Sequence, residues 1–365
     1  MDFFNTHISD KAISSVKDVL KSGFVSAGNI AKNFEDALER ELGLINPISV
    51  NSGTSALHLG LAVANIKPGD EVILPAQTFI ATGLAVLMQG ATPVFADIQY
   101  DTGNIDPDSI RNKITERTKL IIAVHWGGYP CDMDEINNIA NEFNILVMED
   151  AAHALGALYK NKPIGSISNF TAFSFQAIKH LTSGDGGALC CIDNINYFKG
   201  KKKRWFGIDR ENSKISELGE REFDITEVGF KYHLNDVSAA IGLGNLQNFS
   251  SQLSRIQQIA KRYRTELDNV DGLQLLNYKG DRKSAYWLFT VLVENRSDFV
   301  RKLMEFNVPT SVVNQRIDRL SVFNENNEKL SNQERFDKKQ ISIPIHSALT
   351  DEDVSIVISS IMKGW

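Results

Sequence analysis

The sequence predicts an α/β protein whose large, mostly parallel sheet is flanked by helices, followed by a smaller α+β part. Three observations support this fold: short apolar runs alternate with helical patterns, the predicted strands are apolar on both faces, and the pattern changes near residue 234. Strands of this kind, separated by helices, indicate a sheet covered on both sides. The 365 residues suit one large unit or two domains. We expect a large domain over residues 1–245, with an N-terminal arm over 1–25, and a small domain over 246–365.

The expected elements follow in order along the chain. Short apolar runs predict strands at Glu71–Pro75, Pro93–Asp97, Lys119–His125, Ile145–Glu149, Phe170–Phe175 and Ala188–Ile192, with helices at Thr78–Gln89 and Met133–Phe143. A long helix is predicted over Asn235–Arg264, because apolar residues recur there at three- and four-residue steps. The C-terminal part has predicted strands at Trp287–Val293 and Gln340–Pro344, helices at Ser297–Phe306 and Asp351–Met362, and a polar loop over Asn324–Arg335.

Charge and composition argue against several classes of protein. The chain has 39 Lys and Arg against 45 Asp and Glu, a net charge of −6, which disfavours binding to nucleic acid or to an anionic membrane. The three cysteines, Cys131, Cys190 and Cys191, are odd in number and two are adjacent, so we expect free thiols in the cytoplasm. We expect no metal site, no signal peptide and no membrane span, because the corresponding patterns are missing.

A run rich in Ser and Thr opens one helical pattern. Residues 51–57 have the sequence NSGTSAL. Hydroxyl groups and free backbone N–H groups at the positive end of a helix suit a phosphate. The same run can be an ordinary helix cap, which is the better interpretation of the run taken alone.

An acidic residue and a lysine each follow a predicted strand. Asp150 lies at the carboxyl end of a strand, which faces the ligand crevice in open α/β sheets, although it could instead cap a loop. His153, taken alone, is more often a buried core histidine. Lys179 lies between an aromatic strand and the turn GDGG at residues 184–187. A lysine among apolar neighbours can have its pKa lowered enough to form an imine, whereas a lone lysine is usually a solvated surface residue.

Together these motifs describe a site for pyridoxal 5′-phosphate (PLP). A phosphate cup, a carboxylate for the pyridine nitrogen and an imine-forming lysine occur in that order on an α/β fold. The carboxylate keeps the ring nitrogen protonated, so that the ring can accept the electrons of a carbanion. The lysine can then act as acid and base for the proton shift. A fourth motif, GFKYHLND at residues 229–236, precedes the long helix and could be only a connector.

The sequence resembles the DegT/StrS-type nucleotide-sugar aminotransferases, which share the type I (aspartate aminotransferase) fold of PLP-dependent transferases. Segments carrying the resemblance span nearly the whole chain, among them NSGTSALHL, EDAAHALGA, FSFQAIKHLTSGDGG and GFKYHLNDVSAAIGL. It implies transfer of an amino group from L-glutamate to a keto-deoxy sugar nucleotide, with a 4-keto-6-deoxyhexose favoured, for surface polysaccharide or glycoconjugate biosynthesis. Pyridoxamine phosphate would be the intermediate carrier, and the enzyme would be a homodimer with shared active sites.

The resemblance also implies roles for individual residues. Lys179 would form the internal imine and shuttle the proton, Asp150 would pair with the pyridine nitrogen, and His153 would lie near the ring and its O3′ atom. The other expected cofactor-binding residues are Thr54, Ser55 and Ser174 at the phosphate, Phe79 stacked on the ring, and Lys231. The last belongs to the GFKYH segment, which in this family reaches into the neighbouring subunit's site, and many members have Asn at this position.

Two alternative functions and one substrate site remain open at this point. One branch of the family replaces the lysine with histidine and becomes a sugar dehydratase; Lys179 argues against that chemistry, and the presence of both Lys179 and Asp150 argues against a non-catalytic member. A basic run, Lys199 and Lys201–Arg204, is followed by Trp205, Phe206 and Arg210. Such a run is usually a solvated helix face, yet it offers cations for a diphosphate and a flat partner for a base. We expect Arg204, Arg316 and Arg319 to contact the substrate, although the last two could equally form surface salt bridges.

Overall fold

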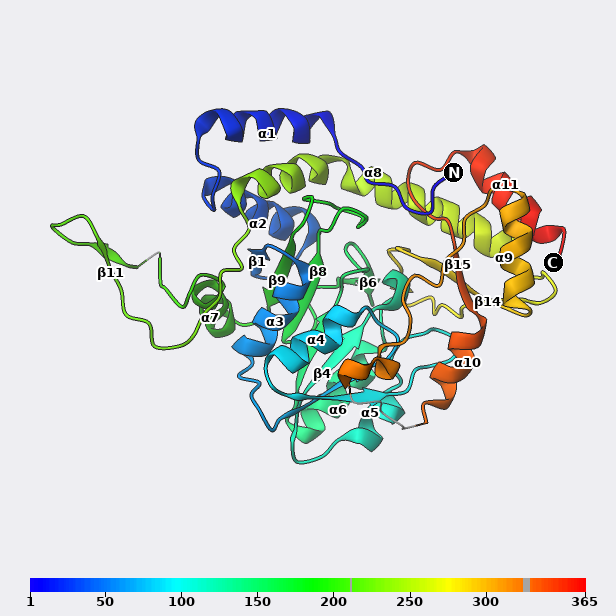
Figure 1. Ribbon diagram of the computed structural model, residues 1–365, viewed down its shortest axis with the longest axis horizontal. Coiled ribbons are helices and arrows are strands. Elements are labelled where there is room, and N and C mark those ends of the chain that lie inside the picture. Colours follow the sequence, from blue (N-terminus) through cyan, green and yellow to red (C-terminus); the bar gives the residue numbers. More distant parts are fainter. Residues whose placement is uncertain (211, 324–328) are drawn as a thin grey trace.

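The computed structural model describes residues 1–210, 212–323 and 329–365. Within these residues the central feature is a seven-stranded sheet with the order β1-β9-β8-β5-β4-β2-β3 (Figure 1). Its strands are β1 (Pro47–Val50), β2 (Glu71–Pro75), β3 (Thr92–Ala96), β4 (Thr118–Val124), β5 (Leu146–Asp150), β8 (Phe170–Ser174) and β9 (Gly187–Cys191). Strands β3, β2, β4, β5 and β8 are parallel, and β9 is antiparallel to both β8 and β1. The predicted mostly parallel sheet is therefore confirmed.

Apolar side chains of the strands alternate between two layers. In β2, Ile73 packs into one layer while Val72 and Leu74 pack into the other, as expected for a sheet covered on both faces. The first layer is covered by α2 (Asn29–Leu42), α5 (Pro107–Lys113), α6 (Met133–Phe143) and the first half of α8 (Asp236–Glu266). The second layer is covered by α3 (Gly53–Val63), α4 (Ile80–Met88) and α7 (Asn194–Arg204).

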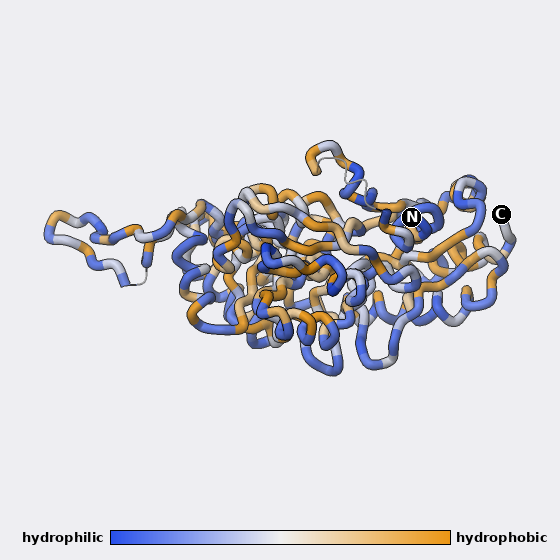
Figure 2. Tube along the Cα trace, turned by 90° about the horizontal axis from the view of Figure 1, so that it is seen from below, coloured by the Kyte–Doolittle hydropathy of each residue, from blue (hydrophilic) through white to orange (hydrophobic). Residues whose placement is uncertain are grey.

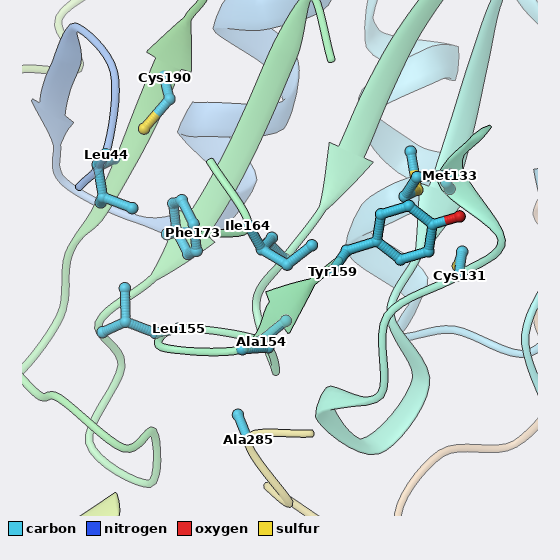
Figure 3. Close-up of a cluster of buried hydrophobic side chains, with 14 of the residues drawn as sticks. Leu44, Cys131, Met133, Ala154, Leu155, Tyr159, Ile164, Phe173, Cys190 and Ala285 are labelled. Carbon is cyan, nitrogen blue, oxygen red and sulfur yellow. The ribbon is translucent and has the colours of Figure 1, made fainter. Parts of the chain in front are cut away.

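The first layer fixes the segment that follows β5. Figure 3 shows Ala154 and Leu155 of this segment below Phe173 of β8, with Tyr159 on one side of Phe173 and Leu44 on the other. The hydroxyl of Tyr159 also accepts a hydrogen bond from the backbone N–H of Asp134 (3.2 Å) at the start of α6. The carboxyl end of β5 is therefore held in place by packing directly behind it.

The C-terminal part has its own core. Helix α8 is capped by Asn235, whose side chain accepts from the N–H of Ser238, and from Ile256 onward it packs against a three-stranded antiparallel sheet. That sheet has the order β12 (Leu273–Leu275), β14 (Phe289–Val293), β15 (Gln340–Ile343), and α9 (Arg296–Glu305) and α11 (Asp351–Met362) complete the core. The strand predicted from Trp287 begins two residues later, because Leu288 donates its N–H to Gly127 O (3.2 Å) outside the sheet. Among the described residues no helix, including α8, is long and apolar enough to cross a membrane.

The loop predicted over 324–335 is partly wrong. Residues 324–328 lie outside the described residues, but Ser331 opens a helix, α10 (Ser331–Lys339). The carboxylate of Asp97 accepts from the N–H groups of Asn332 (2.9 Å) and Gln333 (2.8 Å), so the cap of this helix comes from a distant part of the chain. The polar local sequence does not indicate this helix, because its cap lies far away in the chain.

Several short elements complete the structure. A small sheet joins β13 (Arg282–Lys283), β6 (Leu158–Tyr159) and β7 (Lys162–Pro163), and short 3₁₀ turns are η1 (Trp126–Gly128), η2 (Ile317–Arg319) and η3 (Ser321–Phe323). Strands β10 (Lys214–Ile215) and β11 (Arg221–Glu222) form a hairpin that projects from the body in two views (Figures 1 and 2). Apolar residues on it are exposed, Leu218 by 87% and Ile215 by 66%. A projecting arm with exposed apolar residues is suited to contact another molecule.

The N-terminal segment lies along α8. Helix α1 (Asp10–Ser22) packs on α8 so closely that a Cβ atom at Gly244 would lie 2.5 Å from the backbone of Ala12. The first residues continue across to the C-terminal part, where Asp2 O lies 3.1 Å from Nε2 of His346. Both ends of the chain therefore lie on the same side of the molecule (Figure 1).

Candidate active site

A cavity of about 510 Å³ opens where β5 and β8 end, which is a size typical of small-ligand sites. The side chains around it come from several elements. The residues that line it include Phe4, Ser52, Gly53, Thr54, Thr78, Phe79, Thr82, Asp150, His153, Ser174, Gln176, Lys179, Asp185 and Trp287. Of the predicted site residues, the structure thus brings together Thr54, Phe79, Asp150, His153, Ser174 and Lys179.

Asp150 is the last residue of β5 and is buried. One carboxylate oxygen accepts from the hydroxyl of Thr82 in α4 (2.7 Å), and the other accepts from the N–H of Ala152 (3.2 Å). Burial raises the pKa of Asp150, and these two hydrogen bonds partly oppose the rise. The side chain presents a carboxylate of fixed orientation to the cavity.

Its neighbour Glu149 serves a different purpose. Residues next to each other in a strand face opposite sides of the sheet, and Glu149 is fully buried away from the cavity. It lies 2.8 Å from Nε2 of His125 and accepts from the N–H of Ser168 (3.2 Å) and the hydroxyl of Thr171 (3.3 Å). Since Nδ1 of His125 accepts from the N–H of Cys131 (3.1 Å), Nε2 carries the proton that is donated to Glu149. Only Asp150 of this acidic pair is available to a ligand.

Lys179 lies in the turn that follows β8. Its backbone N–H donates to Gln176 O (2.9 Å), and the side-chain oxygen of Gln176 accepts from the N–H of Ile178 (3.0 Å), which fixes the turn. Burial lowers the pKa of Lys179 to about 7, and the negative charge of Asp150 opposes this shift. An amine with this pKa exists substantially as the free base near neutral pH, as a nucleophile or general base requires.

His153 lies beside the lysine and is held neutral. Burial lowers its pKa well below the usual value, and the positive charge of Lys179 acts in the same direction. Its Nδ1 atom is buried and has no hydrogen-bond partner among the described residues. A buried polar atom without a partner at the edge of a cavity fits a site that is completed by a ligand.

The opposite side of the cavity is the N-terminus of α3. Ser52 caps this helix by accepting from the N–H of Ser55 (3.0 Å), and Gly53 lies so near Ser174 that a Cβ atom there would be 2.8 Å from Ser174 Cβ. Ser55 itself is not a lining residue, since it is buried and its hydroxyl donates to Asn51 (2.6 Å). Thr54, Ser174 and the helix N-terminus form the part of the cavity suited to a phosphate.

The other predicted site residues lie elsewhere in the subunit. Lys231 is exposed and pairs in an isolated β-bridge with Trp205. Arg204 forms an ion pair with Glu35 and donates to Ser49 O (2.9 Å). The remaining two arginines face nearby acids instead of the cavity: Arg316 is buried and bonded to Asp318, and Arg319 is exposed and 3.9 Å from Asp337.

The predicted basic run lines a second cavity of about 320 Å³ beside α7, which shares no lining residue with the first. Its walls include Lys201, Lys202, Arg204, Trp205, Arg210 and His233. The guanidinium of Arg210 lies 4.2 Å from the centre of the Trp205 ring, and that ring lies 3.7 Å from the His233 ring. Burial lowers the pKa of His233 to about 4, and the nearby cations act in the same direction. Flat rings and clustered cations make this cavity suited to an anionic aromatic ligand.

Sequence reasoning missed several residues of the first cavity. Thr82 could have been found, since it lies one helical turn after Thr78 and the two hydroxyls are 2.6 Å apart. Phe4 and Trp287 had no local signal, because they come from the N-terminal segment and from the segment between β13 and β14. The indole of Trp287 lies 3.8 Å from the His153 ring and 3.6 Å from Nζ of Lys179.

The fold and the site define the class of the protein. Around one cavity at the end of a mixed sheet lie a buried carboxylate, a lysine of lowered pKa and a helix N-terminus lined with hydroxyl groups. This combination is typical of a type I PLP-dependent transferase. The chain belongs to the DegT/DnrJ/EryC1/StrS aminotransferase family, whose model matches residues 6–362.

Relatives of known sequence support the class. The chain is 35% identical to the spore coat polysaccharide biosynthesis protein SpsC of Bacillus subtilis (strain 168), over 98% of this chain and 96% of that protein. It is 30% identical to the GDP-perosamine synthase of Escherichia coli O157:H7, over 99% and 98% of the two chains. The protein is therefore a sugar aminotransferase.

Solved structures lead to the same conclusion. The crystal structure of AtS13 from Actinomadura melliaura matches with a TM-score of 0.96 and 35% identity, covering 100% of this chain and 99% of that one. Spr1654 from Streptococcus pneumoniae, solved in a PLP form and a pyridoxamine phosphate form, matches with a TM-score of 0.90 and 30% identity over 100% and 98%. The enzyme is PLP-dependent, in agreement with the prediction, and the residues of the first cavity fit this cofactor.

Proposed function

We propose that this enzyme transfers the amino group of L-glutamate to a keto-deoxy sugar nucleotide, with a 4-keto-6-deoxyhexose as the sugar. The observation that carries the proposal is the pair formed by Lys179 and Asp150, a free amine and a buried carboxylate that line one cavity. The names of the relatives support a substrate from polysaccharide biosynthesis, since they include a GDP-perosamine synthase and a UDP-4-amino-4-deoxy-L-arabinose–oxoglutarate aminotransferase.

Each residue of the cavity has a chemical task in this proposal. When bound, PLP supplies an electron-accepting ring that stabilises negative charge on the substrate carbon. Asp150 would hold the proton on the ring nitrogen, and the hydroxyl of Thr82 keeps that carboxylate in place. Lys179 would hold the cofactor and would take and return the proton at its Nζ atom, for which a pKa of about 7 is suitable. His153, whose neutral form is favoured by burial, would offer a ring nitrogen to the cofactor's O3′ atom without adding positive charge.

The cofactor's remaining contacts follow from the cavity walls. Thr54, Ser174 and the N–H groups at the start of α3 would hold the phosphate, and Ser55 would contribute from behind this wall through its bond to Asn51. Phe79 lines the cavity with 58% of its surface exposed, which leaves its ring available to stack on the cofactor.

We also propose a homodimer in which each site uses residues of both copies. Lys231 is exposed and lies outside the cavity of its own subunit, so it would reach the phosphate in the site of a second copy. Exposed apolar residues on and after α1, including Leu20 (58%) and Phe24 (81%), support a large contact with another molecule.

We further propose that the chain has a large domain over residues 1–245, with an N-terminal arm over 1–25, and a small domain over 246–365. We also propose that the enzyme is cytoplasmic.

The substrate's nucleotide part would bind in the basic cavity beside α7 of a second copy. Lys201 and Lys202 provide cations for a diphosphate, and Trp205 provides a flat surface for the base. Arg204 would shape this cavity while paired with Glu35. Arg316 and Arg319 would contact the sugar only by leaving their partners Asp318 and Asp337, since neither arginine is among the described residues that line the two cavities. Replacing Lys201 and Lys202 with Gln should raise KM for the sugar nucleotide about tenfold and leave kcat and KM for glutamate unchanged. Lys338→Gln serves as the control, and an unchanged KM for the nucleotide contradicts this placement.

The function itself is tested by a coupled screen. The holoenzyme is incubated with glutamate and a panel of 4-keto and 3-keto sugar nucleotides, and product mass is recorded. An amino sugar formed together with 2-oxoglutarate is expected, and Lys179→Ala should abolish it, whereas the surface variant Lys302→Ala should not. A 3-deoxy product without consumption of glutamate would show a dehydratase instead. A protein that takes up no PLP would indicate a non-catalytic member.

A further inference from the structure

Trp287 is a buried residue of the Lys179 cavity that comes from a distant part of the chain. It lies between β13 and β14, with only 6% of its surface exposed. Its side chain is the largest in the cavity wall, and the residue before it, Tyr286, has a positive φ of 52°. A bulky residue in the left-handed region is uncommon and persists where surrounding contacts enforce it.

The surrounding contacts do enforce this conformation. Ala285 donates its N–H to Gly128 O (3.0 Å), and Leu288 donates to Gly127 O (3.2 Å), which ties both ends of the segment to the turn after β4. The indole N–H of Trp287 donates to the backbone oxygen of Ile178 (2.9 Å), and Ile178 is the residue immediately before Lys179. The indole is therefore fixed relative to the lysine by a direct hydrogen bond to its turn.

The indole ring contacts the side chains of Lys179 and His153, which the proposed amino transfer would use. Nζ of Lys179 lies 3.6 Å from the centre of the ring, well within the range of a cation–π contact. The ring of His153 is stacked on it at 3.8 Å with an interplanar angle of 16°, and Phe4 is stacked at 5.1 Å and 23°. The amine thus lies against an aromatic surface inside the cavity.

We propose that Trp287 is a positioning residue for the amino transfer: whenever the amine of Lys179 is not bonded to the cofactor, the indole holds it beside His153, in place for the proton transfer. The proposal rests on the proposed role of Lys179 in moving the proton. An aromatic face attracts the ammonium form without accepting its proton, so the amine stays in the cavity after protonation and can give the proton back. A carboxylate in contact with the amine would hold the proton more tightly.

The charges around the amine come from three elements. Asp150 at the end of β5 and Asp185 in the turn before β9 line the same cavity. His153 follows β5 and His180 follows Lys179; burial lowers the pKa of both imidazoles, that of His180 to about 4. Burial thus favours the neutral form of both histidines, and the indole and Asp150 are the groups that favour the charged amine.

The test is a titration of the amine in the cofactor-free, full-length protein. The protein is labelled with acetic anhydride over pH 5–10, and the acetylated fraction of the Lys179 peptide is measured by mass spectrometry, with the Lys302 peptide as internal standard. Wild type should give a midpoint of about 7. In Trp287→Leu the loss of the aromatic face should lower the midpoint by about one unit, and Trp287→Phe should restore most of it. Trp365→Leu, at the far end of the molecule, is the matched control.

Kinetics of the holoenzyme give the second measurement. Trp287→Leu should lower kcat about tenfold with KM for glutamate and for the sugar nucleotide unchanged, and Trp287→Phe should recover it. A midpoint in Trp287→Leu equal to that of wild type overturns the proposal; Trp287→Met replaces this variant if it does not fold. The titration needs no substrate. A wild-type enzyme that aminates no sugar nucleotide, or a Lys179→Ala variant that stays active, would therefore contradict the proposed function and leave the titration result standing.

Discussion

The hydroxyl of Thr82 should be worth several kilocalories per mole to the folded enzyme, and Thr82→Val measures this contribution. Valine has nearly the shape of threonine, so the change removes a hydroxyl and leaves no cavity. The hydroxyl donates its one hydrogen to Asp150 (2.7 Å), and it therefore accepts from the hydroxyl of Thr78 (2.6 Å). Two hydrogen bonds between buried groups are lost together.

The expected cost follows from these two bonds. A hydrogen bond to a charged group contributes about 1.5–3 kcal/mol, and one between neutral groups about 0.5–1.5 kcal/mol. We expect the free energy of unfolding to fall by about 2–4 kcal/mol. For 365 residues, at roughly 2.1 cal/mol/K of unfolding entropy per residue, the melting temperature should fall by about 3–5 °C.

The pH dependence gives the sharper test. Burial raises the pKa of Asp150 in the folded state above its unfolded value, so ionisation of Asp150 costs folding free energy. That cost is complete above the folded pKa and absent below the unfolded one. Because Thr82 stabilises the ionised form, the cost of Thr82→Val should be full at pH 8 and should shrink as the pH falls through the folded pKa of Asp150.

The assay is urea unfolding of the cofactor-free protein at fixed concentration, at pH 8, 6.5 and 5. Thr82→Ser keeps the hydroxyl and is the control. The reasoning is refuted if Thr82→Val lies within about 0.5 kcal/mol of Thr82→Ser at pH 8, or if the difference between them grows toward acid pH.

Four further variants test other parts of the structure. Asp150→Asn should raise the free energy of unfolding of the cofactor-free protein at pH 8 by about 1 kcal/mol, since a buried charge is removed, while turnover falls by about 10²–10⁴; both are measured on one preparation. Gly53→Ala places a methyl group 2.8 Å from Ser174 Cβ, so the Kd for PLP in an absorbance titration should rise about tenfold or more. Asp97→Ala removes the cap of α10 and should lower the free energy of unfolding by about 1–2 kcal/mol; no change in urea unfolding contradicts the capping role. Gly244→Ala would meet the backbone of Ala12 at 2.5 Å, so limited proteolysis within residues 1–25 should be faster than in wild type.

Features encoded by local patterns were predictable from the sequence. The sheet strands carry apolar residues on both faces, and the pattern shows where β5 ends, at Asp150, and where β8 ends, shortly before Lys179. For that reason the fold class and the central pair of the site could be inferred before the structure. The starts of α8 and α11 agree with their N-terminal caps, Asn235 and Thr350, which lie immediately before the helices.

Features that depend on distant contacts were not predictable. Helix α10 is capped by Asp97, 235 residues before Asn332, so a polar sequence that resembles a loop is helical. The position of Trp287 depends on hydrogen bonds to the turn after β4 and to Ile178, neither of which leaves a local pattern. The basic run was visible as a charge pattern, but its separation from the Lys179 cavity within one subunit depends on how α7 packs.

The contact between Phe4 and Trp287 has a consequence for biosynthesis of the enzyme. Phe4 and Trp287 meet at the wall of one cavity whose lining extends to Asn314, so the cavity is complete only after these distant segments have all been synthesised. Contacts between residues so far apart in sequence form late and slowly. A nascent chain that ends before these segments therefore lacks the closed cavity around Lys179, and we expect it not to retain PLP.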